Sequence, residues 1–207
     1  MGLADNALTT LGRLKQFNGI TEADASQDFK LEFLINSASQ EIENILGRKL
    51  KKTQYIEKVK GNNRLTIQVK NYPLLDVESV HIKINNVTVN ESGYSYDESG
   101  IIEGVRPWGD MGLCHGISNF MVQQSYNIEV IYTAGYVLPK DETEENPRTL
   151  PYDIEAAIFT MVNGVVALAD GGAGLKSFAI SDVRWEWDKD YMQSVRPTLM
   201  RYRAPRF

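Results

Sequence analysis

The sequence predicts an α+β fold that is predominantly an α-helical bundle, with a small antiparallel β-sheet inserted into it. Apolar residues recur with helical spacing near both ends of the 207-residue chain, whereas apolar and polar residues alternate in its middle. We therefore expect residues 1–51 and 134–207 to form a helical body with a C-terminal tail. Residues 52–133 are expected to form an inserted β-rich subdomain.

The clearest helical pattern runs from Gln27 to Leu46. We expect Asp24 or Ser26 to cap this helix and Gly47 to end it, because glycine readily adopts the left-handed conformation found at helix ends. A shorter helix is expected over Ala7–Phe17. The apolar residues of the longer helix keep their spacing over about four turns: Leu31, Leu34, Ile35, Ala38, Ile42, Ile45 and Leu46.

Three alternating runs in the middle of the chain predict half-buried strands. Their apolar positions are Leu65, Ile67 and Val69, then Val80, Ile82 and Ile84, and finally Tyr126, Ile128, Val130 and Tyr132. Asn85-Asn86 predicts a tight hairpin between the second run and Val87–Val89, because asparagine tolerates a positive φ. The glycine-rich stretch Gly100–Asn119 predicts a long loop.

Helical spacing returns after Pro151, a residue suited to the first turn of a helix. Asp153 and Glu155 favour a helix start, because acidic side chains stabilise the positive end of the helix dipole. A last helix is expected over Asp188–Tyr202, either interrupted or restarted at Pro197. The apolar face of the first of these helices is formed by Ile154, Ile158, Met161, Val165 and Leu168.

Composition excludes several classes of protein. The net charge of −5 and the pI near 5.2 argue against a general nucleic-acid binder, which needs a basic face to neutralise phosphates. No apolar run approaches the ~18 residues that a membrane span requires, and the N-terminus lacks the pattern of a secretory signal. The single cysteine, Cys114, cannot form an internal disulfide, as expected for a protein folded in a reducing compartment.

The candidate chemical motifs are weak. His81, His115 and Cys114 are the only soft or borderline metal ligands, and they lack the spacing of a zinc site. The stretch Gly171–Ser177 resembles a phosphate-binding loop, but Leu175 separates the lysine from the last glycine, and the stretch follows a helix rather than a strand. No catalytic triad pattern is present. We therefore expect no enzyme activity, no metal and no cofactor.

Trp185 and Trp187 alternate with charged residues near the C-terminus. Aromatic side chains beside arginine can stack on nucleic-acid bases. They are more often part of a protein interface or of the edge of a core. Because the chain is acidic, we interpret the two tryptophans as possible interface residues.

Four stretches, in order, resemble the head–tail connector proteins of long-tailed phages. The most specific is Tyr132-Thr133-Ala134-Gly135-Tyr136, followed after a short linker by Leu150-Pro151-Tyr152-Asp153-Ile154. The acidic linker Lys140–Arg148 and the loop Gly100–Asn119 depart from the family pattern. The other three stretches are the opening helix pair at Leu8–Leu14 and Phe29–Leu50, the Pro-containing Tyr72–Val80, and Ser177–Asp182 with the final Leu199–Arg203.

This resemblance implies a structural virion protein of a bacteriophage or prophage, made in the host cytoplasm and located in the neck. Such adaptors form a ring, commonly twelve-fold, under the portal protein. The ring extends the DNA channel, which DNA only passes through, and provides a platform for a tail or stopper (head-closure) protein. The isolated subunit can remain a monomer until it meets its partner. Two alternatives stay open: a tail-completion or stopper ring protein, and a small ligand-binding domain.

The C-terminal tail is the candidate portal-binding segment. From Arg196 onward the chain contains four arginines and no acidic residue. Aromatic and arginine side chains are enriched at binding hot spots. We hypothesise that this tail docks on the portal, the alternative being a frayed, solvated terminus. The proposed contact residues are Arg196, Arg201, Tyr202, Arg203, Arg206 and Phe207.

Overall fold

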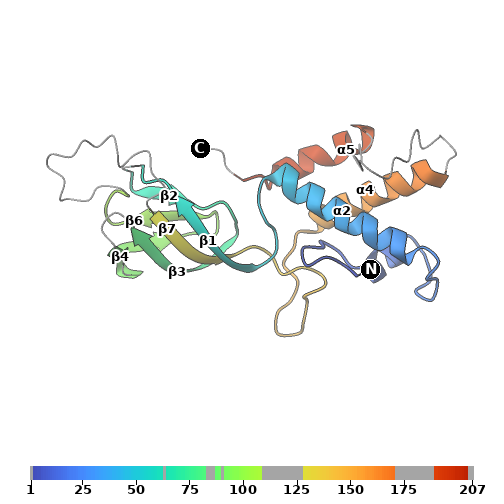
Figure 1. Cartoon of the computed structure of the whole chain (residues 1–207), viewed down its shortest axis with the longest axis horizontal. Helices are drawn as coiled ribbons and strands as arrows, with labels where there is room; N and C mark the ends of the chain where they lie inside the picture. The colour runs from blue at the N-terminus through green and yellow to red at the C-terminus, as the bar shows by residue number, and fades with distance from the viewer. Residues whose placement is uncertain are drawn as a thin grey trace, which may run out of the picture. The chain divides into compact units, whose positions relative to one another are not determined.

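The computed structural model describes residues 2–62, 64–82, 87–89, 91–108, 128–170 and 189–204. The chain divides into two compact units (Figure 1). A helical unit contains Met1–Arg48 and Val137–Ala204, and a β unit contains Lys49–Tyr136. That these parts serve as a connector body and an inserted subdomain stays a prediction.

The helical unit contains α1 (Leu11–Phe17), α2 (Asp28–Leu46), α4 (Tyr152–Asp170) and α5 (Lys189–Met200). The apolar faces of these helices meet in one core, since the residues that carry the helical spacing are the ones removed from solvent. In the described segments, no helix combines the length and the apolar character that crossing a bilayer requires. The core includes Leu8, Leu14, Leu31, Ile35, Ala38, Ile42, Leu46, Leu138, Leu150, Ile154, Ile158, Met161, Val162, Val195 and Leu199.

The helix ends follow local capping chemistry. Helix α1 begins after Thr10, whose hydroxyl accepts a hydrogen bond from the Arg13 backbone N–H at 3.3 Å, so the helix is shorter than predicted. Helix α2 ends at Gly47, whose φ of +69° confirms the predicted glycine stop. The predicted cap of α2 is wrong, because Gln27 occupies that position without a side-chain hydrogen bond. Helix α5 continues through Pro197.

The β unit contains two antiparallel sheets. The four-stranded sheet has the order β1-β7-β3-β4, formed by Thr53–Val59, Ile128–Ala134, Leu74–Ile82 and Val87–Val89. The three-stranded sheet has the order β2-β6-β5, formed by Thr66–Gln68, Ile101–Gly104 and Tyr94–Tyr96, with a short 3₁₀ turn, η1, at Glu91–Gly93. Strands β3 and β4 pair with Ile82 opposite Val87, which confirms the predicted hairpin strands, although Asn85-Asn86 lies outside the described residues.

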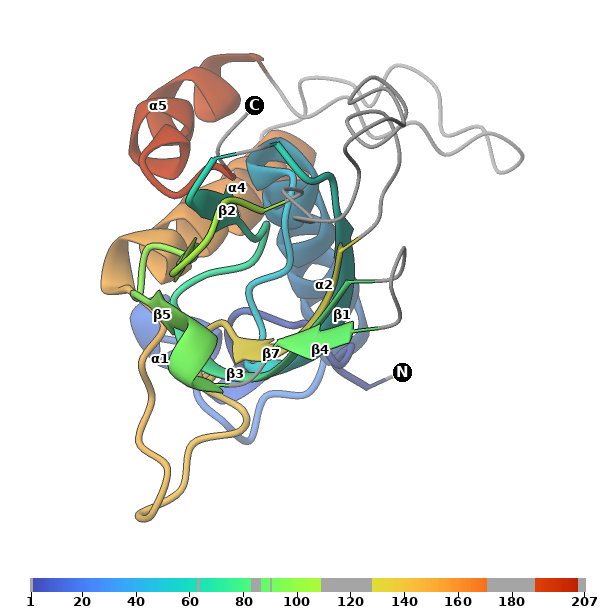
Figure 2. The same cartoon turned by 90° about the vertical axis from the view of Figure 1, so that its left-hand side faces the viewer.

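The core of the β unit draws on both sheets. Figure 2 shows β1, β7, β3 and β4 on one side of this core and β2 and β5 on the other. Tyr132 is fully buried, and its hydroxyl donates a hydrogen bond to Glu57 Oε2 at 2.6 Å while accepting one from Asn71 Nδ2 at 3.2 Å. The core cluster comprises Ile67, Val69, Leu74, Val77, Val80, Tyr94, Ile102, Trp108, Ile128, Val130, Tyr132 and Ala134.

The chain leaves β7 through a tight passage at Gly135. Its φ is +101°, and a Cβ at this position would lie 2.5 Å from the Lys51 carbonyl oxygen. The Gly135 N–H donates to the Pro73 carbonyl at 2.9 Å, and the Tyr136 N–H donates to the Leu50 carbonyl at 2.7 Å. Only glycine combines this backbone conformation with so close an approach. The glycine of the Tyr132–Tyr136 motif is therefore required by the geometry at the end of the sheet.

The predicted fold class is wrong in its emphasis. The described residues form seven strands in two antiparallel sheets beside four helices, so the protein is β-rich and not a predominantly helical bundle. Strands β5 and β6 have three and four residues, too few for a clear alternating pattern. In β1 the pattern is broken by Ile56, which is 66% exposed. Strand β6 also lies at the start of the stretch Gly100–Asn119 that was predicted to be a loop.

Candidate functional site

A cluster of metal-binding side chains is not found in the part of the chain that the structure describes. There, no group of three or more His, Cys, Asp or Glu side chains is placed to hold a metal ion. The ring of His81 lies beside a strand neighbour, with Nδ1 3.2 Å from Thr88 Oγ1. Cys114, His115 and Gly171–Ser177 lie outside the described residues. The described residues instead offer buried polar contacts and exposed charged side chains.

Among the described residues of the helical unit, Glu155 is a buried acid with several polar partners; it lies in the first turns of α4 and is 2% exposed. Its Oε1 accepts hydrogen bonds from Thr9 Oγ1 at 2.6 Å and from Arg13 Nε at 2.8 Å. Its Oε2 accepts a further bond from Arg13 Nη2 at 3.0 Å. Arg148 Nη1 lies 2.7 Å from Oε2 as an ion pair whose angle is not that of a hydrogen bond.

This cluster fixes the charge of Glu155. Burial opposes ionisation, but the hydrogen bonds from Arg13 and Thr9 and the charge of Arg148 outweigh it, so the pKa of the Glu155 carboxyl lies below its usual value. Arg148 also stacks on Tyr152, with its guanidinium carbon 4.1 Å from the ring centroid. One carboxylate thus joins the N-terminal segment, α1, the segment before α4, and α4 itself.

Sequence reasoning assigned Glu155 only to the start of a helix and gave Arg13 and Arg148 no role. The spacing of Glu155 from the apolar residues of α4 could have revealed its buried position. Glu155 precedes the buried Ile158 by three residues and the buried Val162 by seven, so it lies on the apolar face of α4. An acidic residue on such a face needs a buried partner. The partners themselves could not be identified, because Arg13 is 142 residues away in the sequence.

The described part of the C-terminal tail is attached to the chain's own helical unit. The Tyr202 hydroxyl contacts both carboxylate oxygens of Asp153, at 2.9 and 2.8 Å. The buried Arg48 donates from Nε to the Tyr202 carbonyl at 2.8 Å, and the Ala204 N–H donates to the Leu46 carbonyl at 3.0 Å. Tyr202 therefore anchors the tail to its own subunit.

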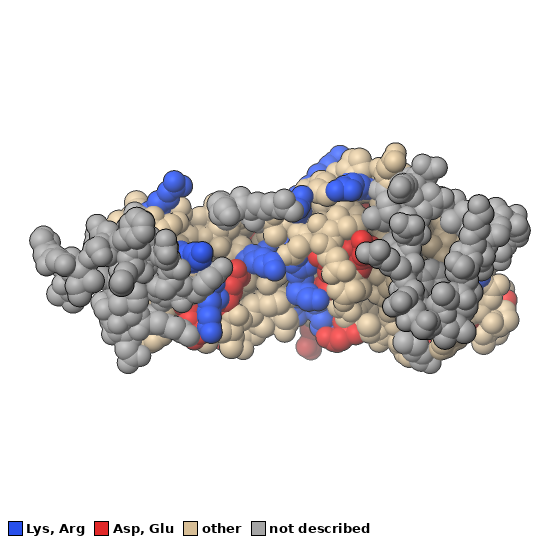
Figure 3. Space-filling model, turned by 45° about the horizontal axis from the view of Figure 1, so that its top comes forward, with Lys and Arg blue, Asp and Glu red and all other residues tan. Residues whose placement is uncertain are grey.

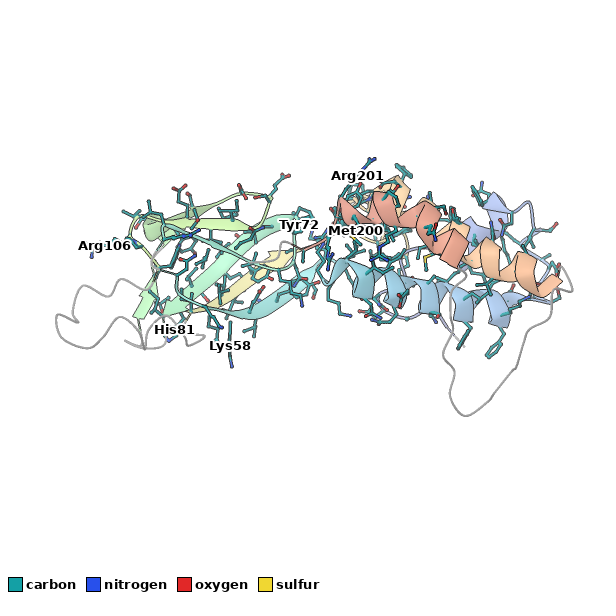
Figure 4. All side chains as sticks on the ribbon, turned by 90° about the horizontal axis from the view of Figure 1, so that it is seen from above. Lys58, Tyr72, His81, Arg106, Met200 and Arg201 are labelled. Carbon is teal, nitrogen blue, oxygen red and sulfur yellow. The ribbon has the colours of Figure 1, made fainter. Side chains whose placement is uncertain are left out.

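The other residues hypothesised to bind the portal are placed differently. Arg196 and Arg201 are exposed, and Figure 4 shows Arg201 projecting away from the helices. Arg203 is partly buried, with Nη1 3.9 Å from Met200 Sδ. The remaining residues of the hypothesis, Arg206 and Phe207, and the possible interface residues Trp185 and Trp187, lie outside the described residues.

Comparison with solved structures finds the same fold in particle necks. The neck of an empty gene transfer agent particle, computed with C6 symmetry, aligns with a TM-score of 0.53 at 13% identity and covers 100% of this chain and 95% of that chain. The neck of the native particle, computed with C12 symmetry, gives a TM-score of 0.54 at 13% identity, covering 100% and 94%. The virion of the native gene transfer agent gives the same values.

Sequence comparison identifies the family. No curated protein shows significant sequence similarity to the chain. The model of the family described as head completion protein matches residues 7–163, which is more than half of the chain and includes both the Tyr132–Tyr136 motif and the start of α4. This match confirms the resemblance to phage head–tail connector proteins, and the chain therefore belongs to the head completion protein family.

Proposed function

We propose that the chain is an adaptor that assembles as a ring under the portal of a phage-like particle, extends the DNA channel and carries the tail or a stopper protein. The observation that carries this proposal is the family match over residues 7–163. It is supported by the fold that the chain shares with neck structures computed with C6 and C12 symmetry. In this role the protein acts through its surfaces and not through catalysis, and it is located in the virion neck.

A ring of identical subunits closes only if each subunit presents two different, complementary faces. The helical unit and the β unit are each compact, and we propose that they supply these faces. The net charge of −5 suits a channel through which DNA passes, because like charge limits adhesion of the phosphate backbone. The ring number in the particle is proposed to be twelve, and the free subunit is proposed to be monomeric until it meets the portal.

Within this proposal, portal docking is assigned to the exposed part of the C-terminal segment. Arg196 and Arg201 are exposed, whereas Tyr202 is hydrogen-bonded to Asp153 and holds the segment in place. Deleting the chain from Met200 onward would remove this anchor as well as the arginines. A sharper test combines Arg196→Glu with Arg201→Glu, and separately ends the chain after Ala204, which keeps the bond from its N–H to Leu46.

The matched control for the arginine reversal is Arg64→Glu with Arg106→Glu, which alters two exposed arginines of the β unit by the same total charge. Co-sedimentation with portal rings is expected to fall for the Arg196/Arg201 variant and to remain unchanged for the control. Equal binding by both variants and by the shortened chain would show that this segment does not dock on the portal.

The ring proposal is tested by mixing the purified chain with the portal protein of the same particle. Size-exclusion chromatography with light scattering is expected to show a complex whose mass equals one portal ring plus a whole ring of this chain. If the chain binds purified tail protein and not portal, it is a tail-completion or stopper protein. If it binds neither, the adaptor proposal fails.

A further inference from the structure

The segment that precedes α4 in the helical unit is an ordered projection with an acidic tip. We call Val137–Leu150 the acidic arm. In both Figure 1 and Figure 2 it extends away from the helices. Its sequence places Asp141, Glu142, Glu144 and Glu145 between Lys140 and Arg148 with no basic residue among them, and the last three of these acids are exposed.

Hydrogen bonds hold the acidic arm in one shape. At its tip, Thr143 and Asn146 exchange backbone hydrogen bonds at 3.1 and 3.2 Å. At its base, the Val137 N–H donates to Thr149 Oγ1 at 2.8 Å, and the Thr149 N–H donates to the Val137 carbonyl at 3.2 Å. Arg148 ties the base to Glu155. The acidic side chains at the tip are therefore carried on a preorganised support, which lowers the entropy lost on docking.

The opposite charge lies along the edge of the four-stranded sheet. We call Lys49–Lys60, which includes β1, the basic edge. It contains five lysines and a single acid, Glu57, and β1 is the outermost strand next to β7. Lys58 is exposed and Figure 4 shows it pointing away from the sheet. Figure 3 shows Lys and Arg side chains exposed among the described residues.

The basic edge also offers an apolar contact. Side chains of β1 alternate, so that Tyr55 and Val59 pack on the core while Ile56 and Lys58 face outward. Ile56 is 66% exposed and lies opposite Ile131 of β7 on this outer face. An exposed apolar side chain among cations is a common composition for a docking surface, because the apolar group contributes affinity and the charges contribute register.

We propose that the acidic arm of one copy docks on the basic edge of the adjacent copy in the ring. This contact rests on the proposed adaptor function, since it joins neighbouring subunits. The charge complementarity favours a second copy as the occupant: each subunit carries one acidic arm and one basic edge, so a closed ring pairs every arm with an edge. A head-to-tail contact of this kind uses two different faces of one chain, as ring closure requires.

Charge reversal and reciprocal rescue test the contact. The arm variant is Glu144→Lys with Glu145→Lys, and the edge variant is Lys58→Glu with Lys60→Glu. Each alone is expected to raise the concentration needed to fill a portal ring by about tenfold, since two facing pairs become repulsive at every subunit boundary. Combining the two variants restores opposite charges and is expected to return assembly to near the wild-type concentration. Raising the salt concentration is expected to weaken the wild-type ring.

The control is Glu98→Lys with Glu103→Lys, which changes two exposed acids of the β unit and alters the net charge as the arm variant does. Circular dichroism of every variant checks that it is folded. If the combined variant assembles no better than either single variant, the contact is overturned. If the edge variant assembles normally and loses only retention on duplex DNA, the basic edge binds DNA and the contact is overturned.

The outcomes also separate this contact from the adaptor function. Wild-type rings that form on the portal and tolerate all the reversals would overturn the arm–edge contact and leave the adaptor function standing. If the arm variant alone fails and the edge variant does not, the arm docks on the portal and the contact between copies is wrong. If the wild-type chain forms no ring on the portal, the adaptor function and the contact fall together.

Discussion

Replacing Glu155 by glutamine tests whether the buried ion cluster holds the helical unit together. Glutamine keeps the shape of the side chain and one acceptor oxygen, so the bond from Thr9 at 2.6 Å can persist. It removes the negative charge and turns an acceptor into an NH₂ group that faces Arg13 Nη2 and Arg148 Nη1, which lie 3.0 and 2.7 Å from Oε2. Two guanidinium groups then lose their counter-charge.

The size of the effect follows from burial. The side chain of Arg148 is 5% exposed, so water would solvate its charge only weakly once Glu155 is replaced. Removing one partner of a buried ion pair costs about 3–5 kcal/mol. The side chain of Arg13 is 38% exposed, and solvent screens its share. We therefore expect Glu155→Gln to destabilise the helical unit by about 3 kcal/mol, the lower end of this range.

Urea denaturation followed by circular dichroism at 222 nm measures this loss, because the signal comes mainly from the helical unit. The matched control is Glu145→Gln, an exposed acid of the acidic arm, for which the change is expected to stay within about 0.5 kcal/mol. If Glu155→Gln destabilises the chain no more than this control does, the cluster does not stabilise the fold.

The same variant predicts a change in pH dependence. The pKa of Glu155 in the folded chain lies below the ordinary value of 4.5, because the bonds from Arg13 and Thr9 and the charge of Arg148 outweigh the effect of burial. The carboxylate therefore contributes stability above about pH 4.5, and this contribution is lost as the pH falls through the lower folded pKa. The difference in stability between wild type and Glu155→Gln is expected to shrink in that range.

Three further predictions concern other contacts. Gly135→Ala is expected to destabilise the β unit by about 2 kcal/mol or more, since alanine is strained at positive φ and its Cβ would clash with the Lys51 backbone. The control Gly12→Ala in α1 is expected to be neutral or stabilising, and thermal unfolding compares the two variants. Tyr202→Phe is expected to cost about 1–2 kcal/mol and to speed proteolysis of the C-terminal segment, because the bond to Asp153 is lost; unchanged cleavage would contradict this. The pKa of Tyr132 is raised by burial and by its bond to Glu57, so stability is expected to fall as the pH rises above about 10 in wild type and not in Tyr132→Phe, as measured by urea denaturation.

The sequence predicted those elements whose pattern is long. Helix α2 carries helical spacing over its whole length, and its glycine stop at Gly47 has a direct conformational reason. The pairing of β3 with β4 was predicted from two alternating runs close together in the chain. In these cases neighbouring residues contain the information that determines the structure.

The proportion of strand to helix could not be predicted in the same way. Strands β5 and β6 have three and four residues and gain their stability from the sheet and from the core beneath it, which no short window of sequence reveals. In β1 the side chains alternate in direction, but the apolar–polar pattern of the sequence is interrupted, because the apolar Ile56 faces outward. As a result, the prediction from the sequence underestimated the β content and overestimated the helical content.

The partners of the candidate site residues could not be predicted, because they lie far away along the chain. From the sequence, Tyr202 was predicted to be an aromatic anchor for the portal, because its partner Asp153 lies 49 residues earlier. Glu155 was predicted only to favour a helix start, because its partner Arg13 lies 142 residues earlier. Exposed charges were easier to recognise. The acidic linker was visible as a departure from the family pattern, although only the structure shows it as an ordered projection.

Electron cryomicroscopy of the intact particle locates the chain directly. If the chain is a neck adaptor, a ring of density is expected between the portal and the tail, into which the helical unit and the β unit each fit, once per subunit, with the C-terminal segment against the portal. A neck that is complete without any density matching these two units, or such density found only elsewhere in the particle, would contradict the assignment of this chain as a neck adaptor.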